Sequence, residues 1–199
     1  MDLDLKTFPS LEAQIAAISD DIAYINHDLD DGFRAGLFDL KNLKKYSFYK
    51  KIIKNYSVNL NTDRFKKEFV RKLINTMVVD LIKQTEKNLN KLKPKNVNDI
   101  RNAGFNIVSF SNKMKKSISE IRFFLNKRMY NHKIIINKTK KYKKLIQDLY
   151  KFYITNKINI PTSWIKSTYK DNNVEKKQVI IDYISGMTDR YILKICNKI

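Results

Sequence analysis

Hydrophobic and polar positions alternate at helical spacing along most of this chain. Near its start, apolar residues recur every three or four positions, as they do on the buried face of an amphipathic helix. These positions are Ile15, Ile18, Ile22, Ile25 and Leu29. Ser10 stands where a helix N-cap is needed, and Gly32 and Gly36 indicate that the helix ends or bends between them.

The clearest periodic segment covers residues 62–92, where large apolar residues again recur every three or four positions. Pro94 marks its end, because proline cannot continue a helix. About thirty residues is long for a helix of a globular protein. We therefore expect a long central helix on which shorter helices pack. The same periodicity predicts these shorter helices over residues 43–56, 112–129 and 138–155.

Other segments are less regular. Residues 97–111, around Gly104, predict a connection with some extended character, and residues 134–136 fit either a strand or a helix. Pro161 to Trp164 predicts a turn, and residues 178–184 lead through Gly186 into a final helix. With four glycines and three prolines in 199 residues, few positions interrupt regular structure. The sequence predicts an all-α fold that forms a single helical unit over residues 1–199.

The face of the first helix opposite the isoleucines is polar and unusually acidic. At about 100° per residue, its members fall within one narrow stripe. They are Asp20, Tyr24, His27, Asp28 and Asp31. Small side chains flank this stripe at Ala13, Ala16, Ala17 and Ala23, which would let a ligand or another helix approach closely. The pattern is typical of one wall of an active site, and a solvated acidic face is the alternative.

The charge of the chain is divided unevenly. Residues 1–40 hold nine acidic side chains against Lys6 and Arg34, a net charge of −7. Residues 41–199 hold 38 basic and 11 acidic side chains, a net charge of +27. A polar site facing so basic a remainder would suit a polyphosphate or a nucleic acid. The joint abundance of lysine, asparagine, isoleucine and tyrosine favours codon bias toward adenine and thymine as the main source of the charge.

The remaining composition excludes several classes of protein. The single Cys196 cannot form an intramolecular disulfide and fits a reducing compartment. The sequence shows neither a signal peptide nor a long apolar run, so we expect a cytoplasmic protein with no membrane partner. It contains no P-loop, dinucleotide fingerprint or cysteine cluster. Its only histidines, His27 and His132, are too few for a hydrolytic metal site of the histidine type, and His132 reads as a structural residue.

Several segments resemble one known family. EAQIAAISDDIAYINHDLDDGFRAGL, at residues 12–37, is similar to the helix that carries the last metal ligand in bacterial HD-domain deoxyguanosinetriphosphate triphosphohydrolase-like proteins. FVRKLINTMVVDLI, FLNKRMYNH, LYKFYITNKINIPTSW and DYISGMTDRYIL agree with later segments in the same order. The resemblance covers nearly the whole chain. It implies an HD-domain-like helical fold, with residues 1–40 ending the catalytic core and residues 41–199 forming the C-terminal helical region.

The resemblance also implies a reaction and roles for residues. Members of the family use a divalent metal ion, held by a histidine, a His-Asp pair and a later aspartate, to hydrolyse a deoxynucleoside triphosphate to deoxynucleoside and tripolyphosphate. Asp20 matches that later aspartate. Tyr24 matches a tyrosine that packs on the deoxyribose, and Asp28 matches an aspartate that accepts a hydrogen bond from its 3′ hydroxyl.

The match departs from the family at one point. The family's histidine and His-Asp pair precede the Asp-Asp-Ile-Ala-Tyr motif by a long stretch, and only eleven residues precede Glu12 here. The pair His27-Asp28 belongs to a later family segment and does not replace them. We therefore expect a truncated or split C-terminal half that carries one of four metal ligands and is inactive alone, its partner being a separately encoded N-terminal half.

Two other classes of function stay open, a decayed gene product and a basic helical protein that binds nucleic acid weakly through its lysines. Arg71 and Arg190 are further candidates for phosphate contacts, because the guanidinium group offers a fixed fork of donors. A structural salt bridge would explain either arginine as well. The family also forms homo-oligomers, but the sequence specifies no stoichiometry.

Overall fold

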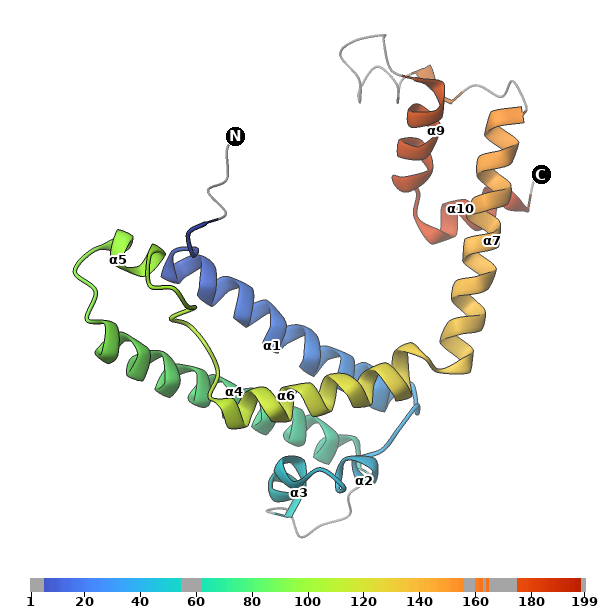
Figure 1. The fold of residues 1–199 in the computed structure, drawn as a ribbon. Coiled ribbons are helices and arrows are strands. Elements are labelled where there is room, and N and C mark those ends of the chain that lie inside the picture. The colour runs from blue at the N-terminus through green and yellow to red at the C-terminus, as the bar shows by residue number, and fades with distance from the viewer. Residues whose placement is uncertain (1–5, 55–61, 156–159, 163, 165–174, 198–199) are drawn as a thin grey trace. The chain divides into compact units, whose positions relative to one another are not determined.

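The structure, a computed structural model, describes residues 6–54, 62–155, 160–162, 164 and 175–197. All regular structure within these ranges is helical (Figure 1), which confirms the prediction of an all-α fold. The chain divides into two compact units, residues 1–132 and residues 133–199, where the sequence predicts one helical unit. None of the described helices is long and apolar enough to cross a membrane.

The first helix, α1, spans Leu11–Arg34, as the pattern predicts. The Ser10 hydroxyl caps it by accepting a hydrogen bond from the Ala13 backbone N–H at 3.5 Å. Of the two glycines expected to end the helix, Gly36 takes the left-handed backbone that favours glycine, at φ +66°. Gly32 lies inside the helix, and the Phe38 ring fills the space that a β-carbon would need there. Gly32 thus permits close packing and does not end α1.

The region after α1 differs from its prediction. One helix is expected over residues 43–56, and the structure has α2 over Leu40–Leu43 and α3 over Ser47–Lys54. Asp39 and Asn42 cap α2 with reciprocal hydrogen bonds, so α2 begins before residue 43, where the predicted helix starts. A turn over residues 44–46 then separates the two helices. Residues 55 and 56 lie outside the described ranges.

The long helix, α4, spans Asp63–Leu92, which confirms its predicted extent. Thr62 caps its start, and Lys93 ends it at φ +49°, directly before Pro94. A short helix, α5, covers Val97–Arg101, where the sequence predicts only a connection, because Asn96 and Asp99 form a capping box. The connection follows, over residues 102–111.

The last helix of the first unit, α6, spans Asn112–Leu125 and continues into a π-helical turn, η1, over Asn126–Tyr130. In the second unit, α7 spans Lys133–Thr155, so the strand alternative for residues 134–136 is wrong. The final helices are α9 over Lys176–Ser185 and α10 over Asp189–Cys196. The predicted turn at Pro161 to Trp164 lies only in part within the described residues.

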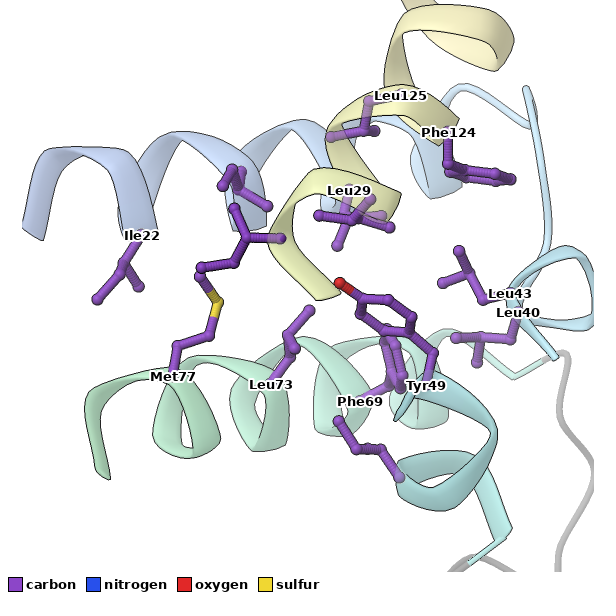
Figure 2. Packing of buried hydrophobic residues seen from close by; sticks show 14 of the residues in the cluster. Ile22, Leu29, Leu40, Leu43, Tyr49, Phe69, Leu73, Met77, Phe124 and Leu125 are labelled. Carbon is purple, nitrogen blue, oxygen red and sulfur yellow. The ribbon is translucent and has the colours of Figure 1, made fainter. Parts of the chain in front are cut away.

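Packing of α1 on α4 forms the core of the first unit. Figure 2 shows Ile22 and Leu29 of α1 facing the apolar side chains that α4 presents every four residues. Those side chains are Phe69, Leu73 and Met77. Tyr49 of α3 points its hydroxyl toward α6 and donates a hydrogen bond to the Ser117 carbonyl at 2.7 Å. Burial, with a smaller effect of Glu120, raises the pKa of Tyr49, so it stays a donor at neutral pH.

The predicted apolar face of α1 is buried only in part. Ile22, Ile25 and Leu29 are buried, but Ile15 is 48% exposed. Gln14 occupies the inward position beside it, because its amide accepts from the Val108 N–H at 3.0 Å and donates to the Pro9 carbonyl at 2.8 Å. A buried polar residue at this point ties the 102–111 connection to α1.

The second unit has its own small core. It is formed by buried residues of α7, α9 and α10 together with Ile160. Tyr183 lies at its centre, in edge-on contact with Tyr153 and Trp164 at ring-centroid distances of 5.8 and 5.1 Å. This unit therefore carries apolar packing independent of the first core.

Replacing Leu29 by alanine should destabilise the first unit by about 2–5 kcal/mol, because Leu29 is fully buried between α1 and α4. Ile15→Ala is the matched control on the same helix, and it should cost less than about 1 kcal/mol since Ile15 is half exposed. Urea unfolding of the full chain measures both changes. Equal losses would show that α1 is not anchored through this face.

Candidate functional site

The polar stripe of α1 is an exposed ridge beside the core. Asp20 and Tyr24 are exposed, Tyr24 by 61%, and Asp28 is half buried. They stand four residues apart, so their side chains follow one line along the helix. His27 and Asp31 are exposed next to them. We call Asp20, Tyr24 and Asp28 the α1 ridge.

Tyr130 of η1 joins the ridge from a distant part of the sequence. Its hydroxyl donates a hydrogen bond to Oδ2 of Asp28. Burial raises the pKa of Tyr130 above its usual range, and the Asp28 carboxylate and the Tyr24 phenol raise it further. Tyr130 therefore remains protonated at neutral pH and holds the Asp28 carboxylate in one orientation.

The π-helical turn sets the position of Tyr130. In η1 the Asn131 backbone N–H donates to the Asn126 carbonyl at 3.0 Å, five residues back, and the Asn131 side chain donates to the same carbonyl at 2.9 Å. Turns of this kind occur frequently at functional sites.

An arginine also reaches α1. Arg122 of α6 forms an ion pair with Asp21 at 3.0 Å, and both side chains are more than half exposed. An exposed pair of this kind contributes little to stability, about 0–1 kcal/mol. The ion pair matters for the site because it places the Arg122 guanidinium group beside Asp21, the residue that follows Asp20.

The ridge can be compared with the ligand sets that metal ions need in proteins. Among the described residues, no group of three or more histidine, cysteine, aspartate or glutamate side chains converges to bind one. Asp20 offers a single exposed carboxylate. The described donors therefore do not fit a resident metal, and further ligands would have to come from another polypeptide segment.

Known proteins resemble the chain over its full length. The family model of the phosphohydrolase-associated domain matches residues 108–198. The whole chain is 39% identical over 206 residues to the deoxyguanosinetriphosphate triphosphohydrolase-like protein of Rickettsia typhi. It is 38% identical over 201 residues to the protein of the same name from Rickettsia rickettsii. In both cases the match covers 100% of this chain and 52% of the relative.

The chain corresponds to the C-terminal half of the deoxyguanosinetriphosphate triphosphohydrolase-like proteins. The resemblance seen in the sequence is thereby confirmed. The chain spans about half the length of the curated relatives that it matches.

The structure places the other candidate residues, His27, Arg71 and Arg190, at separate positions. His27 lies beside the ridge and lines a groove between α1 and α4. Arg71 is exposed on α4, and no hydrogen bond or ion pair links it to the ridge within the described residues. Arg190 is exposed in α10 of the second unit. The ridge residues thus share one surface, whereas neither arginine candidate is brought to it by a described contact.

Sequence reasoning did not select Tyr130 or Arg122. Tyr130 lies 102 residues after Asp28, so helical spacing could not connect them. One signal was present, because Tyr130 stands in the segment FLNKRMYNH that resembles the triphosphohydrolase-like proteins. Arg122 precedes that segment by two residues and carried no signal of its own.

The Tyr130 contact predicts a measurable titration. Absorbance is titrated at alkaline pH for the wild type and for Tyr130→Phe, and the difference between the two curves is the titration of the Tyr130 phenol. This phenol should titrate above the usual tyrosine pKa of about 10. Asp28→Asn should lower that pKa, because it removes the carboxylate. The Tyr130 interaction stabilises the fold at lower pH and is lost as the pH rises through the raised pKa. A missing phenol that titrates near 10 would contradict the contact.

Proposed function

We propose that this chain supplies the substrate-binding wall of a deoxynucleoside triphosphate triphosphohydrolase, which converts the triphosphate and water to deoxynucleoside and tripolyphosphate. The observation that carries the proposal is the exposed α1 ridge with its Asp28 carboxylate held by Tyr130. The names of the Rickettsia relatives support it. We place the reaction in the cytoplasm, since the lone Cys196 suits a reducing compartment.

Each ridge residue has a proposed task. Asp28 accepts a hydrogen bond from the 3′ hydroxyl of the deoxyribose, and Tyr130 keeps the Asp28 carboxylate oriented for it. Tyr24, which is 61% exposed, offers its ring as a surface for the sugar. Positions four residues apart suit a nucleotide that lies along the helix axis.

The triphosphate requires positive charge near Asp20. Arg122 is the arginine that a described contact brings to α1, through its pair with Asp21. Because both partners are exposed, a triphosphate could replace Asp21 as the partner of the guanidinium group. Arg122 is thus the phosphate candidate that a described contact ties to α1.

The chain alone is not proposed to complete the reaction. Asp20 would be one ligand of the divalent metal ion, and the described residues provide no group that could complete its coordination. The relatives are about twice as long as the matched region. We infer that a polypeptide equivalent to the other half of these relatives supplies the remaining ligands.

The reaction can be tested with that half. We expect the full chain, co-expressed with the segment of the Rickettsia typhi relative that precedes the matched region, to release tripolyphosphate from deoxynucleoside triphosphates when a divalent metal ion is present. Asp20→Ala should reduce this rate at least about a hundredfold, because the carboxylate ligand is lost. The measurement is chromatography of the products.

Asp31→Ala is the matched control, since Asp31 is an exposed acid on the same face of α1 without a proposed role. It should retain activity within about threefold of the wild type. A folded complex that releases no tripolyphosphate would refute the proposed function. Equal rates for the two variants would refute the role of Asp20.

Binding of single-stranded nucleic acid is a second candidate function, and one hollow favours it. Lysines from α3, α4 and α6 surround a hollow of about 630 Å³. They are Lys51, Lys72, Lys83, Lys113 and Lys116. Two acids share the hollow, Asp80 and Glu120, and the Asp80 carboxylate is already engaged by the Ser111 N–H and hydroxyl at 2.9 and 2.7 Å. The hollow therefore keeps an excess of positive charge.

Salt dependence tests this second function. The logarithm of the affinity for a single-stranded oligonucleotide should fall linearly with the logarithm of the salt concentration. The double change Lys72→Gln and Lys116→Gln should reduce the slope by about 1.4, at about 0.7 for each contact to a single strand. Lys87→Gln with Lys91→Gln, two exposed lysines of α4 outside the hollow, is the control. Fluorescence anisotropy measures both, and equal slopes would exclude the hollow.

A further inference from the structure

A groove of about 440 Å³ runs between α1 and α4 on the first unit. Its floor and sides are mainly apolar, from Ala23 of α1 and from Val70, Ile74 and Val78 of α4. His27 and Lys67 add polar groups to its lining. Ile22 and Val70 belong both to the lining and to the core, so the groove lies at the edge of the packing already described.

The apolar residues along the groove form a regular stripe. Val70, Ile74, Val78 and Ile82 follow one another at four-residue spacing on α4, as the residues of a buried helix face do. Val70 is partly buried against the core, whereas Ile74, Val78 and Ile82 are 37%, 36% and 51% exposed. Ile15 of α1 is exposed by 48% as well. Large exposed β-branched residues in one row indicate a surface that binds another polypeptide.

The groove and the α1 ridge share one helix. Ala23 and His27 line the groove, and each immediately precedes a ridge residue, Tyr24 and Asp28 respectively. Successive residues of a helix point about 100° apart, so the two surfaces adjoin along α1. A polypeptide seated in the groove would therefore lie beside the ridge, where additional metal ligands would be needed.

We propose that the α1–α4 groove docks the polypeptide equivalent to the half of the triphosphohydrolase-like relatives that precedes the matched region. This inference rests on the proposed function. Two observations point to this occupant. The chain spans 52% of those relatives, which leaves nearly as much polypeptide to be placed. The ridge beside the groove also presents one candidate metal ligand, Asp20, and the described residues contain no converging group that would complete the coordination of the metal ion.

The chemistry of the groove specifies the contacting element. A row of Val and Ile beside Ala23 accepts the apolar face of an amphipathic helix, and the small alanine permits close approach. Asp30 also lines the groove, so together with Lys67 it offers charges of both signs to the polar edges of such a helix. Docking would bury Ile74 and Val78 and leave the outer edge of the α1 ridge accessible to substrate.

Val78 and Val79 give a matched pair of variants for the test. Both are valines in the middle of α4, exposed by 36% and 40%, but Val78 lines the groove and Val79 lines the lysine hollow. Aspartate at either position is compatible with an exposed helix surface. Only at position 78 would docking bury the new charge against apolar side chains.

The experiment measures binding without substrate or metal. The full chain and its two variants are titrated with the preceding segment of the Rickettsia typhi relative, which is co-expressed with each if it does not fold alone, and complexes are quantified by sedimentation velocity. We expect a one-to-one complex with the wild type and with Val79→Asp. Val78→Asp should weaken it by about a hundredfold or more.

Three results would overturn the proposal. They are the absence of a wild-type complex, equal binding by the Val78→Asp and Val79→Asp variants, and self-association of the chain alone that Val78→Asp abolishes. The last would assign the groove to a second copy. Failure of the proposed function is distinct, because it would appear as a wild-type complex that depends on Val78 but releases no tripolyphosphate with metal and substrate. Circular dichroism of each variant verifies that α4 is intact.

Discussion

The packing of α1 against α4 is the constraint on which the rest of the first unit depends. Leu29 of α1 is fully buried, as are Phe69 and Leu73 of α4, so rotating α1 would expose apolar surface and open cavities. This fixes which side of α1 faces outward. The α1 ridge of Asp20, Tyr24 and Asp28 is exposed because the opposite face of the helix is committed to the core. Burial far from any substrate thus orients the candidate site.

Contacts from α6 and η1 turn this exposed ridge into a defined arrangement. The Tyr130 hydroxyl holds Asp28, and Arg122 pairs with Asp21, so two residues distant in sequence are tied to one helix. Asp20, Asp21 and Asp31 of α1 are exposed, in a chain whose residues 41–199 are strongly basic.

The relation to the triphosphohydrolase-like proteins gives these surfaces a common interpretation. The chain matches their C-terminal half, which contains the phosphohydrolase-associated domain at residues 108–198. A wall with one metal-ligand candidate and an adjoining apolar groove is the arrangement expected where a second polypeptide completes a site. The lysine hollow borders the other side of α4, through Val79, and would serve a separate, electrostatic interaction.

Local rules in the sequence determined the two long helices of the first unit, α1 and α4, because periodicity and capping act over a few residues. Ser10, Thr62 and Pro94 marked the limits of α1 and α4, and helical spacing alone aligned Asp20, Tyr24 and Asp28. Only the tertiary structure decided that Gln14 displaces Ile15 from the interior, that Tyr130 reaches Asp28 and that Val78 is left uncovered. Those outcomes depend on which helices meet in space. The spacing of residues along one helix does not specify contacts between residues that lie about a hundred positions apart in the sequence.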